Sequence, residues 1–236
     1  MTYVISDIHG CYDEFIELLD KINFSDDDTL FVLGDAMDRG PEPIKTIQDL
    51  MARPNVWYIL GNHDFMMWSA LRSLAVEVTE ENLSKLTTEA MLAYCSWMEN
   101  GGEVTAKQFR SLSREEQSDI LDYLEDASAY EIIDTNGVQF ILVHAGISGF
   151  DAKKSLDEYE LEDFIWDRPD YSRQFFPDQN TFLVTGHTPT LAIHDKAEIY
   201  LGHNHIAVDC GCVYGGNLSA YCFETGETVY IPSKRL

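Results

Sequence analysis

Polar residues with oxygen and nitrogen donor atoms follow five short apolar runs, each with the composition of a β-strand. In chain order these residues are Asp7 and His9, then Asp35, Asp38 and Arg39, then Asn62, His63 and Asp64, then His144, and finally His187. A single Asp or His after a strand is usually a turn former. Five successive strand ends of this kind predict one shared site, because ligands of open α/β sheets bind beyond the carboxyl ends of the strands.

The side chains at these strand ends favour a particular kind of metal ion. Aspartate, asparagine and histidine together supply mixed oxygen and nitrogen ligands, which suit ions such as Mn²⁺, Fe or Zn²⁺ better than Ca²⁺. Asp7 and His9 are separated by one residue and can act as a partial chelate. The acidic run 25–28 (SDDD) lacks the ligand spacing, central glycine and terminal glutamate of a calcium loop, so we interpret it as a solvated turn.

The order and spacing of the motifs resemble the phosphoprotein-phosphatase branch of the calcineurin-like metallophosphoesterases. That family carries G-D-x-H-G, G-D-x-x-D-R-G, G-N-H-[DE] and two later histidines. The similar segments here are SDIHG (6–10), GDAMDRG (34–40), GNHD (61–64), VHAG (143–146) and TGHTP (185–189). The segments NGG (100–102) and DCGCVYGG (209–216) resemble those of small bacterial and phage members, such as lambda phosphatase and the symmetrical diadenosine tetraphosphatases. Ser6 replaces the usual first glycine, and we expect little consequence.

The resemblance implies an α/β fold in which a central β-sandwich of two mixed sheets is flanked by helices in four αββα layers. It also implies two divalent metal ions, with Mn²⁺ expected and Fe or Zn²⁺ as alternatives. A hydroxide shared by the two ions would attack phosphorus in line. The implied ligands are Asp7, His9 and Asp35 for the first ion, and the bridging Asp35 with Asn62, His144 and His187 for the second.

The same resemblance implies roles for the remaining motif residues. His63 is expected to protonate the leaving oxygen, with Asp38 orienting and charging its imidazole. Arg39 is expected to grip two phosphate oxygens as a planar fork. A second phosphate-binding arginine is expected at Arg168 in IWDRPD; the alternative is a surface salt bridge to a neighbouring aspartate.

A second histidine motif competes for the last ligand position. The segment GHNH (202–205) spells G-H-x-H, which closes the site in many other metallophosphoesterases. His187 is preferred, because it ends a clean apolar strand and carries the G-H-T-P pattern of the branch to which GDAMDRG assigns the chain. His203 and His205 are then expected in a turn, and His194 on the surface.

The charge and the apolar runs exclude several classes of protein. The 236 residues include 41 acidic and 16 basic ones, for a net charge of −25. Such a charge repels phosphate backbones, so we expect no nucleic-acid binding. No apolar run approaches the length of a membrane span. The N-terminus (MTYVISDIHG) lacks a signal-peptide pattern, so we expect a cytoplasmic protein with no membrane contact and no obligate partner.

The five cysteines are scattered and odd in number, which favours reduced thiols. Cys210 and Cys212 form C-x-C, one residue short of the usual redox or zinc spacing, and no second pair is available to complete a zinc site. We interpret them as small residues packed in a turn.

Between the motifs, the sequence predicts one domain over 1–236 with a helical insertion at about 65–130. The near-continuous apolar runs predict strands covered on both faces. Other predicted features are helices at 11–22 and 42–51, the second after Pro41, a capping box at 113–116 and a C-terminal hairpin at 218–232.

Two enzymatic functions fit the motifs. The first is a serine/threonine protein phosphatase, with basic phosphopeptides preferred because of the acidic surface. The second is a hydrolase of small phosphoesters of the dinucleoside polyphosphate type, which needs aromatic stacking surfaces. Trp68, Tyr94 and Trp97 in the insertion are more typical of a core, so the sequence favours the protein phosphatase. A non-catalytic scaffold is disfavoured, because all the motif residues are present.

Overall fold

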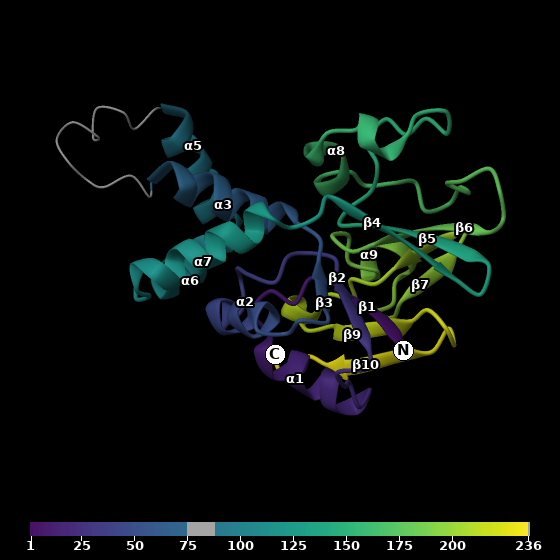
Figure 1. Ribbon diagram of the computed structural model, residues 1–236, viewed down its shortest axis with the longest axis horizontal. Helices are drawn as coiled ribbons and strands as arrows, with labels where there is room; N and C mark the ends of the chain where they lie inside the picture. Colours follow the sequence, from purple (N-terminus) through teal and green to yellow (C-terminus); the bar gives the residue numbers. More distant parts are fainter. Residues whose placement is uncertain (75–87, 236) are drawn as a thin grey trace.

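The computed structural model describes residues 1–74 and 88–235, and its named strands form two five-stranded sheets of mixed direction (Figure 1). In spatial order the first sheet contains β10 (Thr228–Pro232), β9 (Asn217–Cys222), β1 (Thr2–Ile5), β2 (Thr29–Val32) and β3 (Val56–Tyr58). The second contains β4 (Tyr130–Thr135), β5 (Val138–Val143), β6 (Thr181–Thr185), β8 (His205–Ala207) and β7 (Tyr200–Gly202).

The strands that precede the predicted site residues run parallel to one another within each sheet. β1, β2 and β3 are parallel neighbours in the first sheet, and β5, β6 and β8 are parallel neighbours in the second. Parallel neighbours end at the same edge of a sheet, so the loops after them gather at that edge.

Alternate residues of the strands face two different cores, because successive side chains of a strand point to opposite faces. Val4 and Phe31 of the first sheet pack with Leu142 and Val184 of the second, in a cluster between the sheets. Ile5, next to Val4, packs instead with the helices outside the first sheet. Both faces of the central strands are therefore buried, as their apolar runs predicted.

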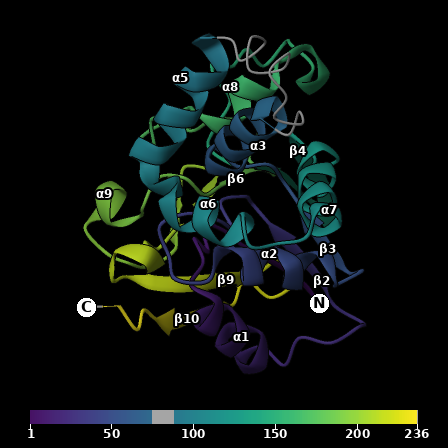
Figure 2. The same cartoon turned by 90° about the vertical axis from the view of Figure 1, so that its left-hand side faces the viewer.

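Helices cover the outer faces of both sheets. Those packed with the first sheet are α1 (Tyr12–Lys21), α2 (Pro43–Met51), α3 (Asn62–Leu74), α5 (Thr88–Trp97), α6 (Glu103–Phe109) and α7 (Arg114–Glu125). Figure 2 shows α1 against β9 and β10 at one edge. α8 (Leu161–Ile165) packs on the second sheet. The four-layer fold expected from the resemblance is confirmed. None of the described helices is long and apolar enough to cross a membrane.

Short helical segments complete the chain. The π-helical turn η1 (Met98–Gly102) joins α5 to α6, and α9 (Leu191–His194) follows the loop after β6. Two 3₁₀ turns, η2 (Leu156–Glu158) and η3 (Cys212–Tyr214), precede α8 and β9.

Local sequence signals placed the ends of α1 and α2 within one residue. α2 begins at Pro43, where a missing N–H costs no helical hydrogen bond; the sequence had suggested Pro41 as the start signal. α7 begins with the predicted capping box, in which the Ser113 amide donates to Glu116 Oε2 (2.8 Å). The C-terminal hairpin of β9 and β10 is also confirmed.

The helical insertion begins and ends earlier than predicted. Its described helices run from α3 to α7, which ends at Glu125, and residues 75–87 lie outside the described part. β4 follows and pairs with β5 through a turn at Asn136 and Gly137. The sequence missed β4, because exposed and half-buried residues alternate along it and leave no continuous apolar run. That residues 1–236 form one domain remains a prediction.

Leu142→Ala is expected to lower the free energy of unfolding by about 2–5 kcal/mol, because truncation leaves a cavity at a fully buried position between the sheets. The matched control is Ile132→Ala on β4, where the side chain is 45% exposed and the loss should be less than half as large. Urea unfolding of both variants measures the difference. Equal losses would show that the cluster between the sheets does not dominate stability.

Candidate metal centre

Hydrogen bonds from backbone amides join three strand-end loops. The amide of Asp7 donates to Gly34 O (3.2 Å), and that of His9 donates to Asp35 O (2.9 Å). The amide of His63, at the start of α3, donates to Asp35 Oδ1 (2.9 Å). The loops after β1, β2 and β3 therefore meet around Asp35.

Six of the predicted site residues have left-handed backbone conformations, with φ between 45° and 68°. These are Asp7, His9, Asp35, Asp38, Arg39 and His187. A non-glycine residue in this region costs of order 1–2 kcal/mol, so the conformation persists only where the surrounding structure imposes it. Such a cluster of strained residues is typical of a functional site.

The motif glycines make room for the ligand side chains. An added Cβ would collide with the Asp35 carboxylate at Gly61, with the backbone of Gly61 at Gly34, and with Ser6 Oγ at Gly186. The glycines that precede Asp35, Asn62 and His187 are therefore required by the close approach of neighbouring loops.

Asp7, His9 and Asp35 are buried together beyond the first sheet. His9 Nε2 lies 3.9 Å from Asp7 Oδ1 and 3.7 Å from Asp35 Oδ2. His9 Nδ1 donates to Met37 O (2.7 Å), which leaves the lone pair of Nε2 facing the carboxylates. Ser6 Oγ donates to the other oxygen of Asp7, so this serine, for which we expected little consequence, restrains a predicted ligand.

Asn62, His144 and His187 converge on the other side of Asp35. His144 Nδ1 donates to Leu33 O (2.5 Å), so its Nε2 carries a lone pair. That nitrogen lies 2.9 Å from Asn62 Oδ1 and 3.5 Å from Asp35 Oδ2, which are both acceptors. His187 Nδ1 lies 2.8 Å from the same Asn62 oxygen. Buried acceptors that converge in this way are satisfied by a cation, so the donor set fits a metal ion.

Two groups of side chains have the spacing to hold one ion each. His9, Asp35 and His63 form one group, and Asp35, His144 and His187 form the other; within each, the ligand atoms lie within 4.8 Å of one another. Asp35 belongs to both groups, as a bridging carboxylate should. The first group includes His63, to which the resemblance assigns proton transfer.

Burial lowers the pKa of two predicted histidine ligands and raises the pKa of Asp35. Burial, with neighbouring His144, lowers the pKa of His187 to about 2, and burial with His63 lowers the pKa of His9 well below its usual value. Both imidazoles are therefore neutral and need release no proton to bind a metal. Burial raises the pKa of Asp35 well above its usual value, although the charge of His63 opposes this. The raised pKa favours the protonated carboxyl group, so a metal ion would compete with a proton for Asp35.

The predicted dyad of His63 and Asp38 is formed, and the helical insertion supports it. His63 Nδ1 donates to Asp38 Oδ2 (2.8 Å), and Asp38 is fully buried. The same carboxylate accepts hydrogen bonds from Trp97 Nε1 (2.9 Å) on α5 and from Thr105 Oγ1 (2.6 Å) on α6. Trp97 is a core residue as expected, but its hydrogen bond was not predicted, because nothing in the sequence relates it to Asp38.

The electrostatic surroundings favour the charged form of the His63 imidazole. Burial by itself would lower the pKa of His63. The charge of Asp35 and the hydrogen bond to Asp38 outweigh that effect, so the pKa is raised above its usual value. A raised pKa suits a residue that donates a proton near neutral pH.

The guanidinium of Arg39 bridges the two histidines of the first group, His9 and His63. Its Nη1 lies 2.6 Å from His9 Nε2, and its Nη2 lies 2.6 Å from His63 Nε2. The Arg39 amide donates to Gly101 O (3.1 Å) in the NGG segment, where φ is 102° and only glycine is comfortable. Its guanidinium carbon lies 5.5 Å from the centre of the Tyr214 ring. The NGG segment therefore positions the arginine.

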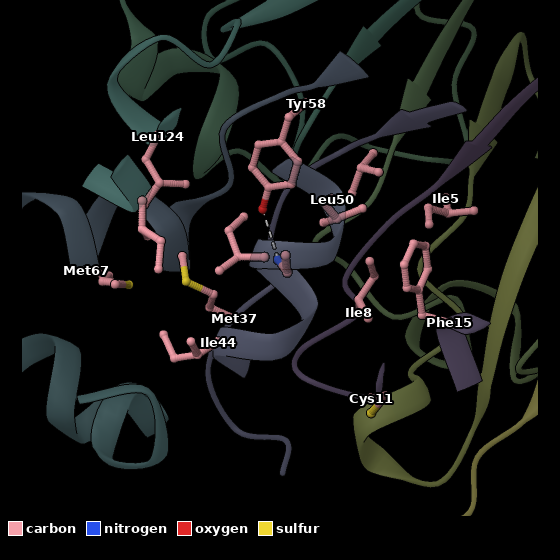
Figure 3. Close-up of a cluster of buried hydrophobic side chains, with 14 of the residues drawn as sticks. Ile5, Ile8, Cys11, Phe15, Met37, Ile44, Leu50, Tyr58, Met67 and Leu124 are labelled. Carbon is pink, nitrogen blue, oxygen red and sulfur yellow. Dashed lines mark hydrogen bonds between the residues drawn. The ribbon is translucent and has the colours of Figure 1, made fainter. Parts of the chain in front are cut away.

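Asp64 supports the loop that carries Asp35. Its Oδ2 accepts hydrogen bonds from the amides of Asp35 (2.8 Å) and Gly61 (3.0 Å), and from the Tyr58 hydroxyl (2.7 Å). The same hydroxyl accepts from the Ala36 amide (3.1 Å), the dashed line in Figure 3. The sequence indicated Asp64 as one of the polar strand-end residues. In the structure its carboxylate accepts hydrogen bonds from backbone amides of the neighbouring loops.

Arg168 lies where a second phosphate-binding arginine was predicted. It lines the same cleft of about 240 Å³ as Arg39, and its Nη1 donates to Thr188 Oγ1 (3.1 Å). Asp170, a candidate partner for a surface salt bridge, pairs with Arg173 instead (2.9 Å). This position agrees with phosphate binding, which remains a prediction.

Five residues that line the cleft were not predicted as site residues, and three of them, Trp166, Tyr214 and Asp209, carry aromatic or titratable side chains. Trp166 follows α8 and is 44% exposed, and Tyr214 ends η3 and is 65% exposed. Asp209 is buried, and its Oδ1 accepts from the Gly211 amide (2.8 Å). Burial, strengthened by the charge of Asp7, raises the pKa of Asp209 well above its usual value. The motif DCGCVYGG (209–216) contains Asp209 and Tyr214, but it did not indicate that they line the cleft.

Of the competing histidine motif, His203 lies in the expected turn, whereas His205 does not. His205 belongs to β8 rather than to a turn, and its Nε2 lies 2.9 Å from Thr185 Oγ1 in a buried setting. Burial lowers its pKa to about 3. His203 is exposed in the turn between β7 and β8, and His194 is half-buried. Of the described residues, the two groups around Asp35 include His187 and neither member of the competing motif.

The profile of the calcineurin-like phosphoesterases matches residues 2–223. The chain therefore belongs to the calcineurin-like phosphoesterase family, whose members are hydrolases that depend on a dinuclear metal centre. This confirms the family expected from the motifs. The narrower placement beside lambda phosphatase remains a prediction.

Curated relatives align along nearly the whole chain. The asymmetrical bis(5'-nucleosyl)-tetraphosphatase PrpE of Bacillus subtilis (strain 168) is 28% identical, with 99% of this chain and 95% of that protein covered. PrpE of Geobacillus thermodenitrificans is also 28% identical, with coverages of 98% and 93%. The symmetrical enzyme of Buchnera aphidicola is 49% identical over 65 residues, which are 27% of this chain and 24% of that protein.

Solved structures show how widely the fold is shared. A structure provisionally identified as a diadenosine tetraphosphatase aligns with a TM-score of 0.67 at 22% identity, over 100% of this chain and 94% of that one. A serine/threonine phosphatase of Saccharomyces cerevisiae aligns with a TM-score of 0.58 at 13% identity, over 100% and 80%. The fold is therefore common to both substrate classes considered for this chain.

Asp35→Asn is expected to remove most of the bound Mn²⁺, because the charge shared by both donor groups is lost. Asp38→Asn should keep its metal content within about twofold while kcat falls about 10- to 100-fold, because that carboxylate acts through His63. Atomic absorption on both variants after dialysis against Mn²⁺ measures the metal. Equal loss of metal from the two would contradict this separation of roles.

The raised pKa of His63 predicts that kcat/KM falls as pH rises through that pKa, because only the protonated imidazole can donate to the leaving oxygen. Asp38→Asn removes a hydrogen bond that raises this pKa, so the alkaline limb should move to lower pH. The loss should be larger for an alkyl phosphate than for an aryl phosphate, whose leaving group needs less protonation. An unmoved limb would mean that another group is the acid.

Proposed function

We propose that this metallophosphoesterase hydrolyses dinucleoside tetraphosphates and cleaves them asymmetrically. The observation that carries the proposal is the similarity to asymmetrical bis(5'-nucleosyl)-tetraphosphatases over 98–99% of this chain and 93–95% of theirs. The sequence motifs alone favoured a protein phosphatase. The relatives support the alternative, and the shared fold is compatible with either substrate.

The rim of the cleft supports a nucleotide substrate. Trp166 and Tyr214 are exposed aromatic residues from different parts of the chain, and both line the cleft. Exposed aromatic faces stack on bases at about 1–3 kcal/mol per base. Of the aromatic residues first considered for stacking, Trp97 is fully buried, and Trp68 and Tyr94 are not among the residues that line the cleft.

The cleft contains cationic side chains that can bind a polyanion even though the chain as a whole is acidic. The net charge of −25 disfavours the approach of a tetraphosphate. Arg39 and Arg168 both line the cleft, and each can bind phosphate oxygens through a planar fork. Together with two divalent ions these side chains reverse the local field.

The ions, held by the carboxylates, Asn62 and the histidines around Asp35, would supply Lewis-acid activation of the phosphate and of water. His63 donates a proton from Nε2 to the leaving phosphate oxygen, and Asp38 keeps the imidazole oriented through Nδ1. His63 Nε2 now faces Arg39 Nη2 at 2.6 Å. A phosphate that draws the Arg39 fork toward itself therefore also frees the acid.

A direct comparison of substrates tests the proposal. The protein with Mn²⁺ is incubated with diadenosine tetraphosphate and, separately, with a phosphoserine protein. We expect kcat/KM to be at least about 100-fold higher for the tetraphosphate, which corresponds to about 2.7 kcal/mol of transition-state binding. Off-centre cleavage gives ATP and AMP, whereas two molecules of ADP would rule out the asymmetrical cleavage. Preference for the phosphoprotein would reject the tetraphosphatase function.

Tyr214→Leu and Trp166→Leu are each expected to raise KM for diadenosine tetraphosphate about 10-fold, because a stacking surface is lost, and to leave KM for p-nitrophenyl phosphate within twofold. Trp57→Leu is the matched control, since Trp57 is 54% exposed on β3 and is not among the residues that line the cleft. Steady-state kinetics on both substrates measure the effect. A similar rise for both substrates would indicate damage to the centre itself.

A further inference from the structure

A third group of potential metal ligands, separate from the two around Asp35, involves the segment that follows His9. Cys11 Sγ, Cys212 Sγ and a carboxylate oxygen of Glu14 lie within 4.8 Å of one another. Cys11 precedes α1, Glu14 lies on α1, and Cys212 begins η3. Both thiols are free, and all three side chains are at least 96% buried. Figure 3 shows Cys11 at the edge of the buried cluster near Ile8 and Phe15.

The burial of the Glu14 carboxylate needs a physical cause. Glutamate is almost never fully buried unless its charge is paired. Its Oε1 accepts a hydrogen bond from the Lys234 amide (2.8 Å), which carries no net charge. The Lys234 ammonium pairs instead with Glu17 (3.0 Å) on the surface. The carboxylate therefore shares its buried position with two sulfur atoms, and the Arg235 side chain hydrogen-bonds to Cys11 and brings a positive charge near the group. An ion bound by the two sulfur atoms and the carboxylate would replace that contact.

We propose that Cys11, Glu14 and Cys212 bind a thiophilic divalent ion such as Zn²⁺, at a site separate from the phosphoester centre. Two thiolates and a carboxylate form a ligand set that favours Zn²⁺ over Mn²⁺ or Mg²⁺. Tetrahedral Zn–S bonds of about 2.3 Å place two sulfurs about 3.8 Å apart, so the two sulfur atoms need to approach by at most about 1 Å. Binding releases the two thiol protons to solvent.

The fold supplies the partner that the C-x-C pattern lacked. The sequence offered no second cysteine pair for Cys210 and Cys212, and we interpreted both as turn packing. The structure brings Cys11 from the start of the chain to Cys212, while Cys210 packs in the cluster between the sheets. A single cysteine and a helical glutamate complete the set.

An ion at this site would tie the loop that carries His9 to the segment that carries Tyr214, which lines the cleft. Cys11 lies two residues after His9, and Cys212 lies two residues before Tyr214. The ion would hold η3 against α1 and so restrain the tyrosine that stands over Arg39. It would have a structural role and would share no ligand with the catalytic ions.

Cobalt distinguishes this site from the phosphoester centre, because Co²⁺ bound to thiolate shows an intense near-ultraviolet charge-transfer band that oxygen and nitrogen ligands do not produce. Metal-free protein is titrated with Co²⁺ under reducing conditions, and equilibrium dialysis counts the bound ions. We expect the wild-type protein to show the band and to bind one more ion per chain than the double variant Cys11→Ser with Cys212→Ser. Glu14→Gln should weaken the band-forming step about 10-fold or more.

The control is Cys222→Ser, which removes another buried thiol and should leave the band and the ion count unchanged. Circular dichroism verifies that each variant is folded, and the wild-type titration needs no variant. A wild-type protein without the thiolate band would overturn the proposal. A band that survives in the double variant but not in Cys222→Ser would also overturn it, since the sulfur ligand would then lie elsewhere.

Discussion

The carboxylate of Asp35 places a negative charge in the interior, and much of the surrounding structure responds to that charge. One oxygen accepts the amide of His63, and the other lies within 4 Å of the Nε2 atoms of His9 and His144. A buried carboxylate without a partner costs several kcal/mol, which is why its pKa is raised. Divalent ions between these donors would offset that cost. Asp64 holds the Asp35 loop from behind through hydrogen bonds to backbone.

The helical insertion is tied to this centre by hydrogen bonds rather than by apolar packing alone. Trp97 and Thr105 bond to Asp38, and Gly101 accepts the amide of Arg39. All three hydrogen bonds involve Asp38 or Arg39, which lie in the loop after β2. A shift of α5 or α6 would therefore reach Asp38 and Arg39, although neither helix carries a predicted ligand. The insertion therefore contacts two of the predicted site residues directly.

The donor groups around Asp35 do not by themselves distinguish a phosphoprotein from a tetraphosphate. The same carboxylates and histidines suit a phosphoprotein or a tetraphosphate, because in both cases the reaction occurs at one phosphorus atom. The two substrates differ in what lies beyond that atom. Trp166 and Tyr214 border the cleft with Arg39 and Arg168, and these four side chains offer stacking surfaces and cations. The insertion, where stacking residues were first sought, supplies core and supporting contacts instead.

The sequence by itself determined the family, the order of the strands that carry the site and the identities of the candidate ligands, because each depends on motifs of a few adjacent residues. It also determined the capping box and the hairpin, which are set by local hydrogen bonds and turn chemistry. Only the tertiary structure decided which distant residues support those ligands. Trp97 beside Asp38 and Cys11 beside Cys212 are separated in the chain by long segments, and no local pattern records such contacts. β4 was not predicted for a related reason. It belongs to the sheet because it pairs with β5, but its exposed and half-buried residues form no apolar run that would indicate a strand.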